Sequence, residues 1–222
     1  MTRKLTIAAL LLSSAAFARA STLLDQLRMP MWRYAGETHI PIKTHMDNVK
    51  PEDVGVLNRW YPLAGEEGQY SAVRFTPKVP MAIQEISFTA PNSSKFGVNC
   101  TVADDRIVNL YVSSDKEPPT NAQPDVSVIV PGQPGNVDEN VLFDVLLDKP
   151  LKLSLGQSVF VAIEHPGLYP DVACLTVSTA GPDDVDAEFW SFATDVPFDW
   201  TGWEELDQTL KPLVSISGYW NF

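Results

Sequence analysis

Short segments of alternating apolar and polar residues recur between residues 70 and 220, and turns rich in proline or glycine separate them. Alternation with a period of two is typical of β-strands that bury one face and expose the other. The 18 prolines cannot donate to a β-ladder, so we expect them at turns and sheet edges. This rhythm predicts an all-β protein, because a βαβ fold would need helical segments between the strands.

The alternation places the predicted strands along most of the chain. They cover residues 70–76, 82–89, 107–113, 126–130, 141–147, 158–164, 173–178, 188–193 and 213–220. The predicted breaks between strands include Pro77, Pro91, Pro118, Pro150 and Pro182. Helical periodicity is limited to residues 22–29 and 203–210, which predict one short turn each. About 8–9 strands of this length predict an antiparallel β-sandwich with a short N-terminal arm.

The first 20 residues have the order of a cleavable signal peptide. Arg3 and Lys4 precede the apolar stretch 5–17, and an A-x-A motif at residues 18–20 precedes Ser21. The apolar stretch is too short for a membrane-spanning helix, which needs about 20 residues. We therefore expect a secreted or periplasmic bacterial-type protein whose mature chain begins at Ser21 and has no transmembrane segment.

The chain is acidic, with 28 Asp and Glu against 16 Lys and Arg. Removal of Arg3, Lys4 and Arg19 with the signal peptide changes the formal charge from −12 to −15. A protein that binds duplex nucleic acid needs a basic patch to neutralise phosphates. We therefore expect no nucleic-acid partner, and we interpret the acidity as a source of solubility outside the cell.

Cys100 and Cys174 are the two cysteines of the chain. An exported protein meets an oxidising environment, where an even number of cysteines is usually paired. A CxxC partner and a nearby histidine are both lacking, which disfavours a redox or metal role. The sequence therefore predicts a disulfide between Cys100 and Cys174.

Residues 21–53 carry little apolar periodicity and contain His39 and His45. We interpret this segment as an N-terminal arm that packs on the sandwich or reaches a partner. The β-sandwich domain is expected over residues 54–222, a length that can bury a self-sufficient core.

The predicted strands also carry a series of short motifs. These are RWY at residues 59–61, YSAVRF at 70–75, ISF at 86–88, LYV at 110–112, LGQSVFVAIE at 155–164, and Trp203 before a final apolar strand. Over residues 59–222 this order resembles the jelly-roll-like β-sandwich accessory modules of secreted bacterial proteins. The resemblance implies a jelly-roll-like fold and a non-catalytic accessory role. The sequence departs from this pattern in two ways. The module stands without a neighbouring catalytic domain, and it has an insertion at residues 92–106.

Catalytic groups are scarce, because the histidines are limited to His39, His45 and His165. We expect His39 and His45 to be solvated in the arm. His165 precedes a Pro-Gly pair, which predicts a turn position with a structural or solvated ring. No G-x-S-x-G motif occurs, and only distant histidines accompany Ser158 and Ser191. We therefore expect a non-enzyme, with a secreted hydrolase whose site is unrecognised as an alternative.

The densest acidic segment contains Asp183, Asp184 and Asp186. Carboxylate oxygens in a loop suit Ca²⁺, but this spacing is not that of an EF-hand. A solvated loop is the main prediction here, and a structural calcium ion is the alternative. We expect no other cofactor. The abundant carboxylates single out no pair for glycoside hydrolysis.

Four aromatic residues fall in or near predicted loops: Trp60, Tyr61, Tyr169 and Trp200. An exposed ring in a loop can stack on the face of a sugar, so these are the candidate ligand-binding residues. The other tryptophans near predicted strands are expected in the core, and these are Trp190, Trp203 and Trp220.

The sequence favours a non-catalytic secreted module that works by binding, as an accessory or surface component. Edge strands and the arm would supply a surface for a protein partner, because an unpaired edge can take up an added strand. A carbohydrate-binding module is the alternative, with a polysaccharide at the cell surface as its partner.

Overall fold

The computed structural model of the chain describes residues 42–48, 61–64, 67–94, 99–167, 170–178, 187–203 and 211–221. The chain divides into two units, Met1–Thr44 and His45–Phe222. The predicted signal peptide, the helical turn at 22–29, residues 204–210 of the second turn and most of the predicted arm lie outside the described residues.

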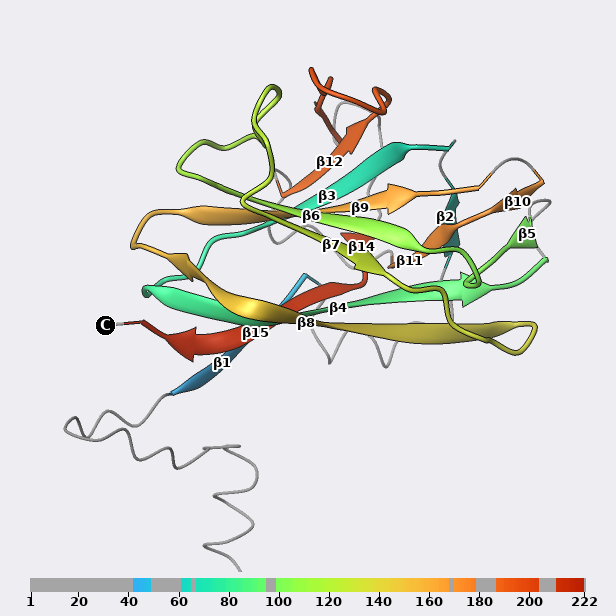
Figure 1. Ribbon diagram of the computed structural model, residues 1–222, viewed down its shortest axis with the longest axis horizontal. Coiled ribbons are helices and arrows are strands. Elements are labelled where there is room, and N and C mark those ends of the chain that lie inside the picture. The colour runs from blue at the N-terminus through green and yellow to red at the C-terminus, as the bar shows by residue number, and fades with distance from the viewer. Residues whose placement is uncertain are drawn as a thin grey trace, which may run out of the picture. The chain divides into compact units, whose positions relative to one another are not determined.

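Two antiparallel sheets packed face to face form a β-sandwich (Figure 1). The larger sheet has the strand order β13-β12-β3-β9-β6-β7. In that order its strands are Thr201–Gly202, Glu188–Ser191, Gln69–Phe75, Ser158–His165, Arg106–Ser113 and Val126–Val130. The four-stranded sheet has the order β1-β15-β4-β8. Its strands are Lys43–Asp47, Val214–Trp220, Met81–Asn92 and Glu139–Leu153.

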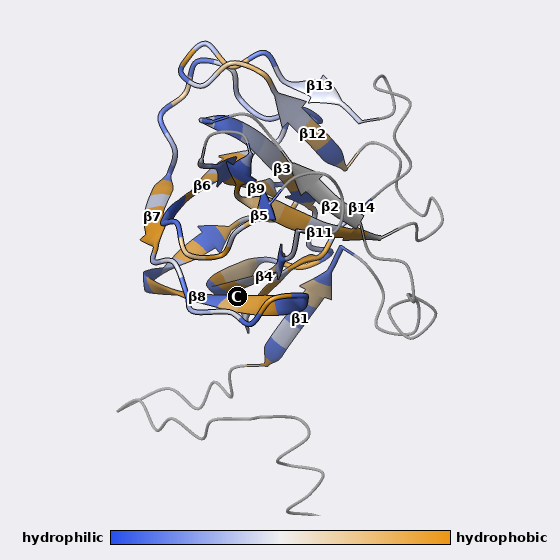
Figure 2. Cartoon of the chain, turned by 90° about the vertical axis from the view of Figure 1, so that its right-hand side faces the viewer, coloured by the Kyte–Doolittle hydropathy of each residue, from blue (hydrophilic) through white to orange (hydrophobic). Residues whose placement is uncertain are grey.

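Two small sheets lie beside the sandwich. One contains β14 (Lys211–Pro212), β11 (Cys174–Ser178) and β2 (Tyr61–Ala64), and the other pairs β10 (Asp171–Val172) with β5 (Asn99–Cys100). Leu175 of β11 belongs to the main core. Figure 2 places β11 and β14 on the opposite side of the sandwich from β7. The three-stranded sheet therefore covers one side of the sandwich.

The predicted antiparallel β-sandwich is confirmed, and every predicted strand segment contains a strand of the structure. The strands that the alternation did not predict are β1, β2, β5, β10, β13 and β14. None of them is longer than five residues. The two-residue strands β5, β10, β13 and β14 carry too few residues for a period of two to be recognised.

The main core lies between the two large sheets and takes one face of each strand. Phe88 of β4 and Phe143 of β8 stack with their ring centroids 4.9 Å apart. Val108 of β6 and Val161 of β9 reach the same core from the six-stranded sheet. Burial of these alternate side chains is the main favourable term for such a fold, at about 25 cal/mol per Å² of apolar surface.

Over the strands β3 and β9 the outer face of the six-stranded sheet is also buried, contrary to the prediction of half-buried strands. In β9 every residue except Glu164 is buried. The two segments 114–125 and 192–200 cover this face, where the Phe198 amide donates to the Thr120 carbonyl at 2.8 Å. Tyr70 and Phe198 pack edge to face beneath them, with centroids 5.5 Å apart. Alternation could not predict this second layer, because its covering residues come from irregular segments.

Two predicted breaks, at Pro91 and Pro150, instead lie inside strands. Pro150 falls where the register of β8 against β4 shifts, between Leu146 and Leu151. Pro91 pairs with Asn140 of β8, beyond the last residue of β4 that pairs with β15. Both prolines therefore occupy irregular or one-sided places of a ladder, where the missing N–H costs no hydrogen bond.

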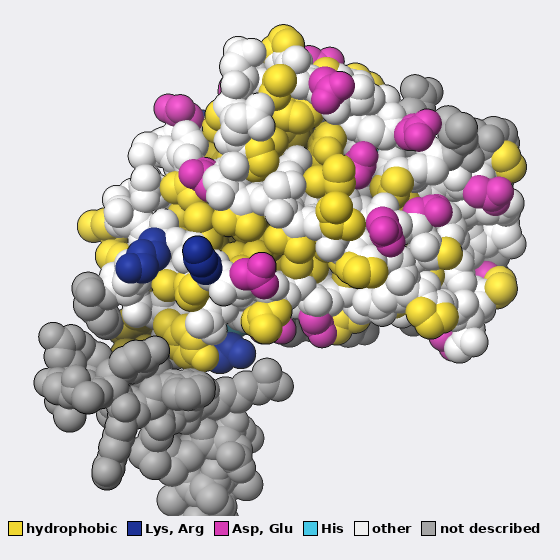
Figure 3. Space-filling model, in the orientation of Figure 1, with side chains coloured by type: hydrophobic (Ala, Val, Ile, Leu, Met, Phe, Trp, Pro, Cys, Tyr) yellow, Lys and Arg dark blue, Asp and Glu magenta, His cyan; other side chains and the backbone are white. Residues whose placement is uncertain are grey.

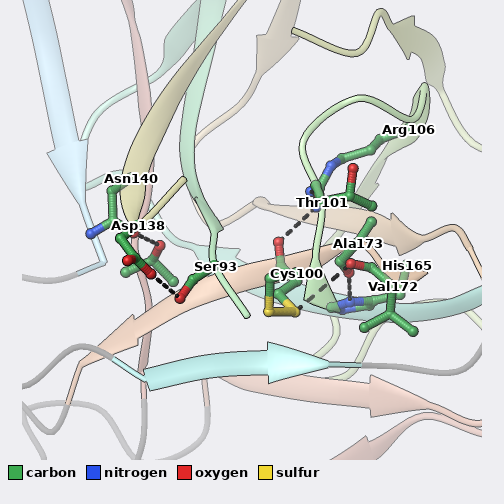
Figure 4. Close-up of a disulfide and its surroundings, with 11 residues drawn as sticks. Ser93, Cys100, Thr101, Arg106, Asp138, Asn140, His165, Val172 and Ala173 are labelled. Carbon is green, nitrogen blue, oxygen red and sulfur yellow. Dashed lines mark hydrogen bonds between the residues drawn. A yellow bond between two sulfur atoms is a disulfide. The ribbon is translucent and has the colours of Figure 1, made fainter. Parts of the chain in front are cut away.

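Cys100 and Cys174 form the predicted disulfide, with Cα atoms 5.4 Å apart (Figure 4). The bond joins β5 to β11, and Val172 of β10 packs against both cysteines. Ser93 and Cys100 also exchange backbone hydrogen bonds of 2.8 and 3.0 Å. The predicted insertion at residues 92–106 is thus fastened to the sandwich at Cys100.

Removal of the disulfide should destabilise the domain. The bond closes a loop with a sequence separation of 74 residues, for which chain entropy gives up to about 4 kcal/mol of stabilisation. Urea denaturation of the oxidised protein should therefore show a higher midpoint than denaturation in reductant. The double variant Cys100→Ser, Cys174→Ser is the control, and reductant should not change its midpoint. Equal midpoints for the oxidised and reduced wild-type protein would show that the bond is not formed.

Candidate binding surface

The two large sheets leave one side of the sandwich without a covering element among the described residues. The strand β7 is the edge of the six-stranded sheet, and β8 is the edge of the four-stranded sheet. Both lie on the same side of the sandwich (Figure 2). They are not joined to each other by ladder hydrogen bonds in the described residues. The core between them is therefore bordered there by side chains and, at one end, by the segment 131–138 that joins β7 to β8, where Gly135 lies against Val102 and Val141.

Apolar side chains line this side. Five of them pack against the main core but stay only partly buried: Val112, Val126, Val128, Val141 and Leu151. We call the surface that they form the open side. Figure 3 looks onto the face that carries β7 and β8 and shows apolar side chains gathered across its centre. Contiguous exposed apolar surface on a soluble domain marks an interaction site more often than scattered single residues do.

Further exposed apolar residues flank the open side. Ile129 of β7 is 67% exposed and Leu146 of β8 is 74% exposed. Both point away from the core, because their neighbours Val128 and Val145 face it. The open side is thus bordered by apolar residues on both edge strands.

Buried Ser71 and His165 form a pair that resembles a nucleophile and its base. The Ser71 Oγ and the His165 Nε2 lie 2.7 Å apart, and the His165 Nδ1 lies 3.0 Å from the Ala173 carbonyl. Because a carbonyl only accepts, Nδ1 carries the proton and Nε2 accepts from the serine hydroxyl. Burial, helped by the charge of Arg106, lowers the pKa of His165 to about 3, while the hydrogen bond to the Ala173 carbonyl opposes the shift.

This pair is structural rather than reactive in the described geometry. Ser71 is 1% exposed and His165 is fully buried, so a substrate has no access to either atom. A base with a pKa far below neutrality is also poorly matched to proton abstraction near pH 7. His165 ends β9 and is not in a solvated turn, which corrects that part of the prediction. The hydrogen bond instead links β3 to the end of β9.

Arg106 is fully buried at one end of the main core (Figure 4). Its guanidinium donates to the Cys174 carbonyl at 2.9 Å and to the Thr101 carbonyl at 3.1 Å. The rings of Phe88 and Phe143 lie within 6 Å of it and add cation–π attraction. Burial lowers the pKa of Arg106 to about 10, while Asp104 opposes the shift. The side chain therefore stays charged at neutral pH and fastens segment 101–106 to β11.

The predicted ligand-binding aromatics do not come together in the described residues. The Trp200 indole is partly buried, packs on Phe198 with centroids 5.2 Å apart, and donates its N–H to the Pro119 carbonyl at 3.1 Å. Tyr61 begins β2, in the small three-stranded sheet. Trp60 and Tyr169 lie outside the described residues.

The remaining sequence candidates are mostly structural or outside the described residues. Asp183, Asp184, Asp186 and His39 lie outside them, and within the described part no three His, Cys, Asp or Glu side chains are placed to hold a metal ion. His45 is exposed and contacts Asp47 at 2.7 Å. The hydroxyls of Ser158 and Ser191 bond to Thr76 and Asp199, respectively.

The predicted core tryptophans are placed individually. Trp190 and Trp203 are buried as expected, but Trp220 is only partly buried. Trp220 is the last residue of β15.

Sequence reasoning did not identify the open side. The only signal was the segment VSVIV at residues 126–130, which contains no charged residue. Whether such a strand lies at an edge depends on the order of strands in the sheet, and the alternation does not carry that information.

Replacement of Arg106 should destabilise the domain more than replacement of a surface cation. Arg106→Ala leaves two buried carbonyls without their donor and opens a cavity, which should cost about 3 kcal/mol. Arg106→Lys should destabilise the domain less than Arg106→Ala but more than replacement of a surface cation, because an ammonium cannot present the planar fork of a guanidinium. The exposed Lys149→Ala is the control and should change the free energy of unfolding by less than about 0.5 kcal/mol. Equal effects of Arg106→Ala and Lys149→Ala in urea denaturation would contradict the assigned role.

The buried His165 should make the domain less stable at acidic pH. Its pKa is near 6.5 in the unfolded chain and about 3 in the folded one. Between these values the unfolded chain binds a proton that the folded chain does not, so the free energy of unfolding falls as pH decreases from 6.5 toward 3. The slope for one group is up to about 1.4 kcal/mol per pH unit, and His165 contributes nothing above pH 6.5.

His165→Asn keeps a donor for the Ala173 carbonyl and should flatten this pH dependence, measured as urea midpoints between pH 4 and 7. His45→Asn is the control, since the His45 side chain is 52% exposed, and it should keep the wild-type slope. A His165→Asn protein with the full wild-type slope would place the acid sensitivity in other groups.

The described residues contain no helix with the length and hydrophobicity of a membrane span. No protein-family model matches the chain, and no curated protein matches it either. The all-β antiparallel architecture is therefore established by the strand pairing itself.

Proposed function

We propose that this protein is a non-catalytic exported module that binds a protein partner through its open side. The observation that supports this role is the apolar surface between β7 and β8, where side chains of the core stay partly exposed. Covering them with a partner would remove apolar surface from water, which is the main favourable term in most protein associations.

The Cys100–Cys174 bond supports an extracytoplasmic location, because disulfides persist in oxidising compartments. The predicted signal peptide at residues 1–20 agrees with such a location. An accessory role at the cell surface or in the periplasm fits both features.

The chemistry of the open side favours a protein over a polysaccharide. Its five residues are all aliphatic, whereas sugar recognition typically uses exposed aromatic rings that stack on the pyranose face. Trp200 lies instead in the second layer, with its N–H used by the Pro119 carbonyl. A polysaccharide partner therefore remains the alternative that the experiment must separate.

The test is a pull-down with immobilised residues 21–222, using cell-envelope proteins, secreted proteins and insoluble polysaccharides in parallel. Each is run with calcium and with chelator. Val126→Asp should abolish capture of a protein partner, because it places a charge on the open side. Leu155→Asp is the matched control and should retain capture, since Leu155 is 72% exposed but lies in the turn between β8 and β9.

Thermal denaturation must show both variants folded. Protein capture that Val126→Asp abolishes and Leu155→Asp retains supports the proposal. Retention on a polysaccharide that Val126→Asp leaves unchanged favours the carbohydrate-binding alternative. Absence of any retained protein overturns the proposal.

A further inference from the structure

We infer that the partner adds a β-strand to the free edge of β7, and that this strand is a cationic segment with alternating apolar side chains. The inference rests on the proposed function and specifies how the partner is held.

The edge of β7 lacks the usual protection against strand addition. Natural sheets protect their edges with charged residues, proline, bulges or very short strands. The edge strand β8 contains Lys149 and Pro150 in an irregular stretch, β1 has the sequence KTHMD, and β13 has two residues. By contrast, β7 is five residues long, reads VSVIV and pairs regularly with β6. Among the described edges of the large sheets, β7 is the most suitable acceptor.

The direction of the free hydrogen-bonding groups follows from the ladder. The Ile107 amide of β6 donates to the Glu164 side chain of β9 at 3.1 Å, so Ile107 faces β9. Backbone groups alternate along a strand, so Arg106, Val108 and Leu110 face β7. Their partners Val130, Val128 and Val126 therefore face β6. The N–H and C=O groups of the intervening Ser127 and Ile129 point outward, where an added strand would bind them.

An added strand would also cover the open side. Its inward side chains would lie beside Val126 and Val128 and approach Val141 across the gap between the sheets. Its outward side chains would lie beside Ile129, which pairs with the partly buried Ile107. Alternating apolar residues on the partner match these positions, because the side chains of a strand alternate between its two faces.

The charge around the open side selects a cationic strand. Asp125 precedes β7, and Asp105 accepts from the Gly132 amide just beyond its other end at 2.9 Å. On β8, the exposed Asp144 and Asp148 are offset by the exposed Lys149 and Lys152, so the acidic groups that remain are those beside β7. Figure 3 shows further carboxylates around the apolar centre of this face. A second copy of the chain would carry the same net charge of −12 and be repelled, whereas lysine or arginine side chains would be attracted.

The probe is the capped peptide Lys-Val-Thr-Val-Lys-Val-Thr-Val-Lys, labelled for fluorescence anisotropy and titrated with residues 21–222. Ser127→Pro removes one outward N–H without removing a ladder bond to β6, so it should weaken binding at least about tenfold while the melting temperature changes little. Ser127→Thr is the matched control and should bind as the wild type does. Ile129→Lys is a second edge variant and should also weaken binding, because it adds like charge to the edge.

Two peptide controls test the chemistry of the occupant. A peptide with glutamate in place of lysine should not bind, and binding of the lysine peptide should weaken as salt rises from about 50 to about 500 mM. Equal binding of the lysine peptide by the wild type, Ser127→Pro and Ile129→Lys would overturn strand addition at β7, and so would absence of binding to the wild type. Equal binding of both peptides would overturn the charge selection.

Failure of this inference is distinguishable from failure of the proposed function. If the pull-down captures a protein that Val126→Asp loses but Ser127→Pro retains, the open side binds a partner without strand addition. A dimer of the chain in analytical ultracentrifugation that Ser127→Pro dissociates would make a second copy the occupant and overturn the cationic segment.

Discussion

The apolar faces of the six-stranded and four-stranded sheets pack against each other, and the stacked rings of Phe88 and Phe143 lie in this contact. This contact between the two sheets determines the order of the strands, the position of the sheet edges and the location of the open side. Two sheets of finite width leave two sides to be covered. The small sheet that contains β11 covers one of them, and β7 and β8 border the other. The candidate surface is therefore a consequence of how the core is enclosed.

A second layer changes what the six-stranded sheet can offer a partner. Segments 114–125 and 192–200 cover its outer face, where Phe198 and Trp200 pack beneath backbone hydrogen bonds. This layer uses the Trp200 indole, so that ring serves the fold. Part of the exposed apolar surface lies on the edge strands β7 and β8, and Phe192 and Val196 of the segment 192–200 are also exposed. Exposed apolar side chains together with an unpaired strand edge favour a partner that binds as an added β-strand.

Buried polar groups hold the end of the sandwich near the disulfide. Arg106 and His165 donate to the neighbouring carbonyls of Cys174 and Ala173, and the disulfide joins the same segment to β5. A buried charge without a carboxylate partner is costly unless its hydrogen bonds are satisfied. Two carbonyls and two aromatic rings supply part of that compensation here, while the Arg106 Nε has no hydrogen-bond partner. Burial lowers the pKa of His165 and keeps the ring neutral, and the positive charge of Arg106 acts in the same direction. The disulfide and these buried hydrogen bonds therefore hold this end of the domain together. The open side differs from it, because the side chains there are aliphatic and partly exposed.

The sequence by itself determined the nine predicted strands, the fold class and the pairing of Cys100 with Cys174, because period-two alternation and an even cysteine count are local or compositional signals. The tertiary structure alone decided that His165 is buried, that Pro150 lies inside a strand and that β7 is an edge. Alternation shows which side of a strand is apolar, but it does not show which strand lies beside it or which distant segment covers its other face. Those depend on contacts between residues far apart in the chain, and the candidate surface consists of residues that such contacts leave uncovered.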